Sequence, residues 1–149
     1  MVDSSNIKFT LKVDSGDWVG IGFGDDMNNH DMFYVSDGNF YDCYATGEST
    51  PTTDSDQADY TFTGSSGTYE ISWPLTPADT SKDDTIEKDK FVQFSWARGS
   101  GSIADHGSNV GEFAIKVDST GSSVEIEEGS FSRLLMGSKL LIALLFLVQ

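Results

Sequence analysis

Cysteine, histidine and basic residues are scarce in this chain, and each shortage excludes a class of protein. The 149 residues include one cysteine, two histidines, and 9 Lys and Arg against 24 Asp and Glu. A single cysteine excludes an intrachain disulfide and the cysteine-rich zinc and iron–sulfur sites. The formal net charge of −15 argues against nucleic-acid binding, because phosphate recognition requires a basic face. Two histidines leave few arrangements for catalysis or metal ligation.

Aromatic residues, in contrast, are plentiful. The chain contains ten Phe, five Tyr and three Trp within a hydrophobic fraction of 38%. This composition fills a core and argues against general disorder despite the charge. The length suits one domain.

Short segments with alternating polarity predict strands joined by tight turns. In residues 7–13 the apolar Ile7, Phe9, Leu11 and Val13 alternate with polar residues, the period of a half-buried strand. Many short strands with Gly, Asp and Ser turns predict an all-β fold, a two-sheet antiparallel sandwich. The polar segments 48–59 and 76–90 are predicted as loops, the second with room for one helical turn. The predicted strands are 7–13, 18–23, 31–35, 40–45, 60–63, 68–73, 91–97, 112–117 and a short one at 124–128.

The second predicted strand alternates glycine with large apolar residues. Glycine weakens a strand, so three glycines on one face suggest that something bulky lies against that face. Close packing of the facing sheet, or a bulge, is the alternative explanation. The glycine face is Gly20, Gly22 and Gly24, and the opposite face is Val19, Ile21 and Phe23.

The C-terminal segment predicts a tail outside the domain. We assign residues 1–128 to the sandwich and 129–149 to a linker and hydrophobic tail, with Lys139 inside its apolar part, Leu134–Val148. An apolar run of about 15 residues is shorter than the roughly 20 of a membrane span. The small residues Gly121–Ser123, a polar spacer and the apolar run fit a GPI-attachment signal. A short membrane anchor and a packed amphipathic helix are the alternatives. The first six residues do not resemble a signal peptide, which predicts a processed or truncated start.

The candidate cofactor ligands are His30, His106, Cys43 and the methionines, of which Met27 and His106 have the most unusual surroundings. Met27 lies among Asp and Asn residues in a predicted loop, whereas methionine normally fills gaps in a core. His106 lies in a glycine-flanked loop between two predicted strands, where functional residues often gather. Together they fit the axial ligands of a non-covalent haem, whose six-coordinate iron passes electrons and does little substrate chemistry. Ordinary packing of Met27 and a surface role for His106 are the alternatives.

Other cofactor chemistries fit the inventory less well. Blue copper requires a histidine close after the cysteine, and none follows Cys43 closely. The C-x-x-C-H motif of covalent haem and the G-x-S-x-G motif of serine hydrolases are absent, so a hydrolase is a remote alternative. The acidic loop around Asp25 and Asp26 lacks the EF-hand spacing and is interpreted as solvated.

Two motifs resemble the signatures of DOMON domains. Trp18–Gly24 (WVGIGFG), followed by Met27 and then Asp31-Met32, resembles the first signature. Three later segments resemble the second signature of the family: Phe94–Gly99 (FSWARG), Ala104–Gly107 (ADHG) and Gly111–Phe113 (GEF). The resemblance covers roughly residues 7–117 and implies an immunoglobulin-like β-sandwich. The family includes cellobiose-dehydrogenase-type b cytochromes and auxin-induced secreted cytochromes. Some members bind haem b, and others are thought to bind sugars.

The resemblance also implies site residues. In haem-binding members a methionine after the first motif and a histidine in the later loop ligate the iron, and Met27 and His106 match these positions. Met32 is the rival methionine, at a position that matches no ligand, and His30 matches none either. Arg98 is expected to pair with a haem propionate, with a plain surface charge as the alternative. The expected pocket walls, each of which would equally suit the sandwich core, are Phe23, Phe33, Phe94 and Trp96.

The function that the resemblance implies is electron transfer by a haem b domain at the cell surface, not catalysis. The expected partners are a separate redox protein or a small-molecule electron donor or acceptor. The C-terminal tail is expected to attach the domain to the membrane. One alternative is a haem-free module that binds carbohydrate or a related ligand. Another is a structural or adhesive surface protein, kept soluble and spaced by its charge.

Overall fold

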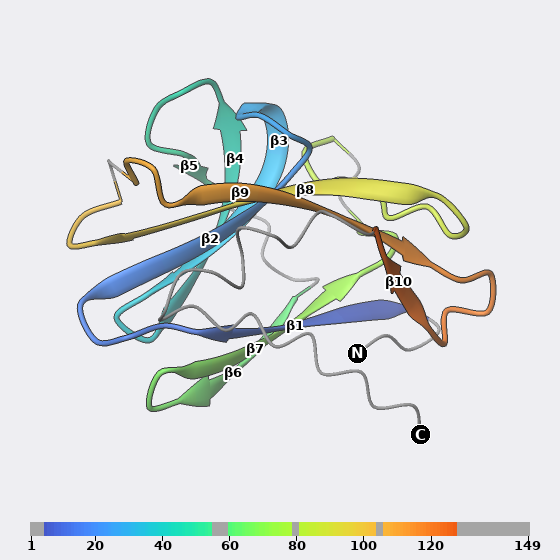
Figure 1. The fold of residues 1–149 in the computed structure, drawn as a ribbon, viewed down its shortest axis with the longest axis horizontal. Helices are drawn as coiled ribbons and strands as arrows, with labels where there is room; N and C mark the ends of the chain where they lie inside the picture. Colours follow the sequence, from blue (N-terminus) through green and yellow to red (C-terminus); the bar gives the residue numbers. More distant parts are fainter. Residues whose placement is uncertain (1–4, 55–59, 79–80, 104–105, 128–149) are drawn as a thin grey trace.

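The computed structural model describes residues 5–54, 60–78, 81–103 and 106–127, which are all β, without a helix (Figure 1). The strands, in chain order, are β1 (Asn6–Lys12), β2 (Asp17–Phe23), β3 (Asn28–Ser36), β4 (Asn39–Thr46), β5 (Thr52–Thr53), β6 (Thr61–Ser65), β7 (Thr68–Pro74), β8 (Phe91–Ser100), β9 (Val110–Val117) and β10 (Val124–Ile126).

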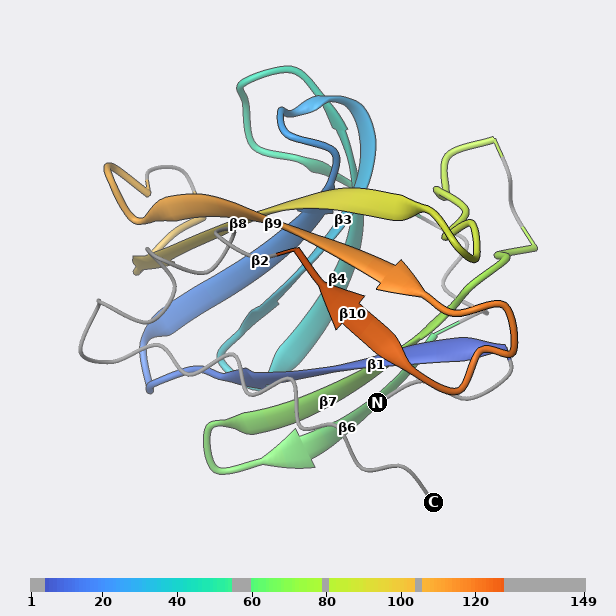
Figure 2. The ribbon, with the colours of Figure 1, turned by 45° about the vertical axis from the view of Figure 1, so that its right-hand side comes forward.

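The strands form two antiparallel sheets that lie face to face. The smaller sheet has the order β1-β7-β6, and the larger has the order β10-β9-β8-β2-β3-β4-β5. Figures 1 and 2 show the three-stranded sheet as a separate layer beneath the larger one. The predicted two-sheet sandwich is therefore confirmed. Its central strand, β2, is paired on one side with β3 and on the other with β8.

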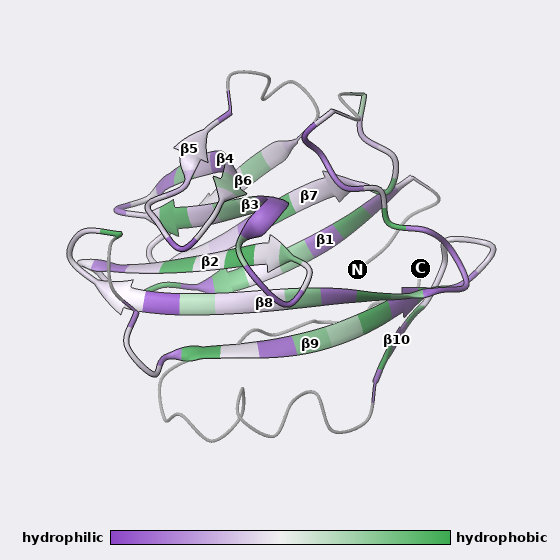
Figure 3. Cartoon of the chain, turned by 90° about the horizontal axis from the view of Figure 1, so that it is seen from above, coloured by the Kyte–Doolittle hydropathy of each residue, from purple (hydrophilic) through white to green (hydrophobic). Residues whose placement is uncertain are grey.

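The core lies between the sheets and is rich in aromatic rings. In β1, Ile7, Phe9 and Leu11 are fully buried, and the residues between them are more exposed. Hydrophobic and hydrophilic bands alternate accordingly along this strand (Figure 3). The Phe9 ring lies 5.6 Å from the Phe33 ring and 5.8 Å from the Phe94 ring, both on the other sheet. These edge and tilted contacts join the two layers at the centre of the domain.

The structure extends and corrects the strand assignments. The predicted loop 48–59 contains the short strand β5, which pairs with β4. The segment 76–90 forms no helical turn in its described part. Within the described residues, no helix has the length and apolar character that a bilayer crossing requires. Residues 129–149, the predicted linker and tail, lie outside the described residues, so their membrane attachment stays a prediction.

A group of aspartates is buried at one edge of the sandwich. Asp31 on β3 and Asp42 on β4 are 1% and 0% exposed, and Asp54 and Asp83 are also buried. Lys82 donates a hydrogen bond to Asp54 over 3.1 Å, whereas both carboxylate oxygens of Asp42 are buried without a hydrogen-bond partner. Burial, with Asp83 and Asp42 nearby, raises the pKa of Asp31 to about 9. Burial, with Asp83 and Asp54 nearby, raises the pKa of Asp42 to about 7. This part of the interior therefore retains protons at neutral pH.

Candidate cofactor site

A cavity of about 580 Å³ lies on the outer face of the larger sheet. This volume falls within the range of roughly 300–1,000 Å³ that is typical of small-molecule and cofactor sites. The strands β2, β3, β8 and β9 contribute to its lining, together with the loops after β2, β4 and β8. Met27 and His106 both line it. The two residues that the sequence marked as ligands therefore share one cavity.

Small residues form the part of the cavity floor between β2 and β8, whereas Tyr34 and Met32 of β3 lie on the other side of Gly20 and Gly22. Gly20 and Gly22 of β2 lie opposite Ala97 and Ser95 of β8, and residues opposite each other in a sheet share a face. Val19, Ile21 and Phe23, which alternate with these glycines, belong to the core between the sheets. The structure thus assigns the apolar face of β2 to the core, and Gly20 and Gly22 to the cavity, whereas Gly24 follows the strand and does not line the cavity. A bound group would meet backbone and short side chains above β2 and β8.

Met27 is presented by the turn between β2 and β3. Gly24 begins this turn with a φ of 77°, and its amide donates a hydrogen bond to the Gln93 carbonyl over 2.9 Å. Asp26 accepts hydrogen bonds from the backbone amide of Asn28 over 2.8 Å and from its side chain over 3.0 Å. These bonds, the side-chain one first, lower the pKa of Asp26. The half-buried Met27 side chain therefore comes from a turn with its own internal bonds.

His106 comes from the other end of the same sheet face. The end of β8 is aligned with the start of β2, so the loop after β8 and the turn after β2 lie at opposite ends of β2. The Nδ1 atom of His106 lies 3.2 Å from the Gly107 carbonyl oxygen. When Nδ1 donates to this carbonyl, Nε2 becomes the acceptor nitrogen of the ring. Metal-ligating histidines commonly have this arrangement, which makes His106 chemically suited to an axial position.

The other residues expected around a haem divide between the two faces. Phe23, Phe33 and Phe94 do not line the cavity and lie in the core. Trp96 is 8% exposed, belongs to the core and also lines the cavity. Arg98 does not line it, because it pairs with Val19, whose side chain faces the core. Three of the four expected aromatic walls and the expected propionate partner thus do not line this cavity, and their contact with a haem stays a prediction. Strand parity alone does not say which face is covered.

Several lining residues had no place in the sequence interpretation. Trp18 and Tyr34 lie on the same face as Gly20, and the indole Nε1 of Trp18 is buried without a hydrogen-bond partner. Trp18 lies two residues before Gly20 on the same strand, so the alternation of the strand could have placed it on the glycine face. Met32, the rival methionine, also lines the cavity, opposite Gly22.

The described lining is acidic. It includes Asp25, Asp26, Glu48 and Glu112 and contains no Lys or Arg among the described residues. The described part of the chain holds no group of three or more His, Cys, Asp or Glu side chains arranged for a metal ion. Met27 and His106 are therefore the candidate metal ligands among the described residues of this face.

Comparison with known proteins agrees with this fold. The family model of the DOMON domain matches residues 1–99, a range that contains Met27 but ends before His106. No curated protein matches the chain in sequence. Among solved structures, the cytochrome domain of Myriococcum thermophilum cellobiose dehydrogenase is similar with a TM-score of 0.55 and 13% identity. The match covers 83% of this chain and 72% of that chain, and at this identity it concerns the fold. Because the family model matches well over half of its residues, the chain belongs to the DOMON family.

Proposed function

We propose that this DOMON domain binds haem b in the outer-face cavity and transfers electrons, with Met27 and His106 as the axial ligands. One observation carries the proposal: a thioether and an imidazole line a single cavity, above the glycines of β2 and the short side chains of β8. Bound haem supplies one-electron chemistry, and a Met/His pair favours a raised reduction potential. Because Met27 and His106 would both bind the iron, no position on it would remain for a substrate, and the site would suit electron transfer.

The chain's own residues would bind and orient the group from three sides. Gly20, Gly22 and Ala97 provide a flat floor, and Trp18 closes part of one wall. The carboxylates of the described lining disfavour a buried propionate, because like charges repel in a poorly solvated site. The propionates would therefore point toward the opening and solvent.

The wider role is proposed from the family and the sequence. We place the domain outside the cell, where residues 129–149 would attach it to the membrane. Its partner would be a separate redox protein or a small-molecule electron donor or acceptor. The net charge of −15 argues against nucleic acid as the partner.

An absorption spectrum of protein produced with haem available tests the cofactor. We expect a low-spin haem spectrum in the parent protein, and at least roughly tenfold weaker haem retention in Met27→Ala and His106→Ala. Met32→Leu is the matched control, because Met32 lines the same cavity and its replacement should leave the spectrum unchanged. A folded, colourless protein that takes up no added haemin would rule the proposal out.

The cavity also suits a second class of ligand, a carbohydrate held without haem. Tyr34 lines the cavity and stacks on Tyr41, with ring centroids 4.5 Å apart and planes 10° from parallel. Aromatic faces and acidic side chains match the apolar faces and hydroxyl groups of a sugar. Glycan binding that survives Met27→Ala and His106→Ala but is lost in Tyr34→Ala would favour this function.

A further inference from the structure

A histidine that comes three residues after Met27, His30, packs against the turn that carries this methionine. Between Asn28 and His30 the pairing of β3 with β4 shifts register, and Asn29 has a φ of 59°. Such a bulge bends the strand and redirects the side chains beside it. Here His30 lies against the turn that precedes it. A Cβ atom placed on Gly24 would lie 2.6 to 2.9 Å from three atoms of the His30 ring, so the imidazole packs directly on this glycine.

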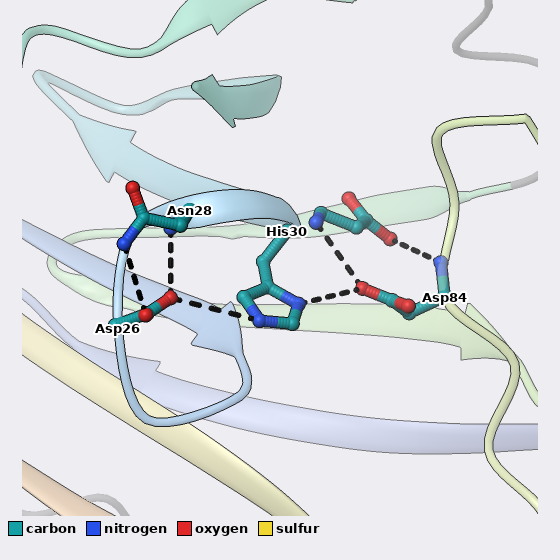
Figure 4. A network of polar contacts seen from close by, with 5 residues as sticks. Asp26, Asn28, His30 and Asp84 are labelled. Atoms are coloured by element: carbon teal, nitrogen blue, oxygen red, sulfur yellow. Dashed lines mark hydrogen bonds and ion pairs between the residues drawn. The ribbon is translucent and has the colours of Figure 1, made fainter. Parts of the chain in front are cut away.

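Both ring nitrogens of His30 face carboxylates from different segments. Nε2 lies 3.7 Å from Asp26 Oδ1, and Nδ1 lies 3.4 Å from Asp84 Oδ2 (Figure 4). Asp26 belongs to the Met27 turn and holds the backbone and side chain of Asn28. In Figure 4 the imidazole lies between the two acids and connects them.

Asp84 is itself tied to the sheet. Its Oδ2 atom accepts a hydrogen bond from the amide of Asp31 over 3.3 Å, and its own amide donates to Asp31 Oδ2 over 3.3 Å. Asp31 is a buried residue of β3. The contacts therefore run without interruption from the sheet through Asp84, His30 and Asp26 to the turn on both sides of Met27.

We propose that His30 is a positioning residue for Met27, which holds the turn in place by bridging Asp26 to the sheet-anchored Asp84. This inference rests on the proposed haem site. It assigns a role to the histidine that no cofactor hypothesis used. His30 does not line the cavity and would not touch the haem.

The size of the effect follows from exposure. The side chains of His30, Asp26 and Asp84 are 32%, 51% and 42% exposed, so water and salt screen the bridge. Exposed ion pairs shift an equilibrium by at most about fivefold. The bridge therefore contributes little to global stability. It acts on the turn, where it limits the conformations that Met27 samples before it binds iron.

The first test compares His30→Ala with Lys8→Ala in the haem-loaded protein. Lys8→Ala is a matched control, because it removes a similarly exposed ion pair, Lys8 to Glu70, on the other sheet. In His30→Ala we expect the methionine-bound fraction to fall by up to about fivefold. The methionine-to-iron charge-transfer absorption should weaken and the reduction potential should drop. His30→Asn and His30→Gln each carry a side-chain amide that can form hydrogen bonds. These variants should therefore keep a larger methionine-bound fraction than His30→Ala.

A second measurement needs no haem. Amide hydrogen exchange in the apo-protein should accelerate by up to about fivefold at Asn28 in His30→Ala but not at Ile21 in β2. If the parent protein takes up no haem but this exchange effect is seen, the haem proposal fails and the bridge stands. If haem binds and neither the charge-transfer absorption nor the exchange changes in His30→Ala, the bridge is refuted. If His30→Ala melts far below the parent protein, the role is structural and the positioning inference is equally refuted.

Discussion

Gly20 and Gly22 act in this domain through the side chains that they lack. Neither has a positive φ, so the backbone at these positions accepts other residues. A Cβ atom on Gly22 would lie 3.1 Å from Ser95 Oγ, and one on Gly20 would lie 3.3 Å from the Phe33 carbonyl oxygen. Both contacts require the neighbour to move by a few tenths of an ångström, which the Ser95 side chain allows more readily than the backbone carbonyl of Phe33. Glycine at these two positions therefore matters mainly because it leaves the space above β2 open, and not because the strand requires its backbone conformation.

Gly22→Val should close the cavity without unfolding the domain. Valine suits a strand, so we expect unfolding free energy to change by no more than about 1 kcal/mol. Its branched side chain would stand on the cavity floor and weaken haem binding by at least about tenfold. Haemin titration and denaturant unfolding measure the two effects. Thr63→Val on the exposed strand β6 is the control. Parent-like haem affinity in folded Gly22→Val would show that the haem, if bound, lies elsewhere.

Each central strand of the larger sheet serves two sites at once. Along β8, Phe94 belongs to the core alone, Ser95 and Ala97 line the cavity, and Trp96 belongs to both. The Phe94 ring lies 4.7 Å from that of Phe23 and 5.2 Å from that of Phe113. Substitutions at neighbouring positions of one strand should therefore affect different properties. Substitutions at positions that face the core should change stability, and substitutions at positions that face only the cavity should change ligand binding.

Phe94→Leu tests this division. Loss of ring contacts in a packed core should lower unfolding free energy by roughly 1–2 kcal/mol, less than the 3–5 of a Phe→Ala change. The haem spectrum of the folded protein should stay the same, because Phe94 does not line the cavity. Phe91→Leu provides the comparison, since Phe91 is 45% exposed and its replacement should matter by less than about 0.5 kcal/mol. A shifted haem spectrum in Phe94→Leu would mean that the haem lies between the sheets.

Across the whole molecule, acidic residues are abundant, and some of them are buried. The chain has a net charge of −15, and Asp31 and Asp42 are buried within it. A group whose pKa is raised by folding binds more protons in the folded state than in the unfolded state. The unfolding free energy then falls as pH rises between the two pKa values. This window runs from about 4 to about 9 for Asp31 and from about 4 to about 7 for Asp42.

We therefore expect the domain to lose stability as pH rises from about 4 toward 9. Each proton contributes a slope of at most about 1.4 kcal/mol per pH unit. Asp42→Asn removes one titration and should raise the melting temperature at pH 8 more than at pH 4. Asp118→Asn is the control, because folding lowers the pKa of Asp118 whereas it raises that of Asp42. The amides of Ser122 and Ser123 hold the pKa of the exposed Asp118 below its usual range, so its contribution is lost only in acid. Melting curves that are flat with pH in the parent protein would contradict this expectation.

Local patterns in the sequence were enough to predict most of the elements. Alternation in β1 and the hairpin turns identified the strands, because a strand exposes successive side chains to opposite faces. A methionine and a histidine in polar loops are chemically conspicuous, and the structure brings Met27 and His106 to one cavity, while their role as ligands stays a prediction. β5 was missed, because its two residues are polar and exposed and gain their strand geometry from pairing with β4.

By itself, the sequence determined that this chain is an all-β domain and that β2 has one glycine face and one apolar face. Only the tertiary structure decided which face the second sheet covers. That choice sends Phe23, Phe33 and Phe94 into the core and leaves Gly20 and Gly22 beneath the cavity. The same long-range pairing buries Asp42 and brings Asp84 beside His30. The physical reason is that a period of two defines two faces, whereas burial depends on strands that are distant in sequence.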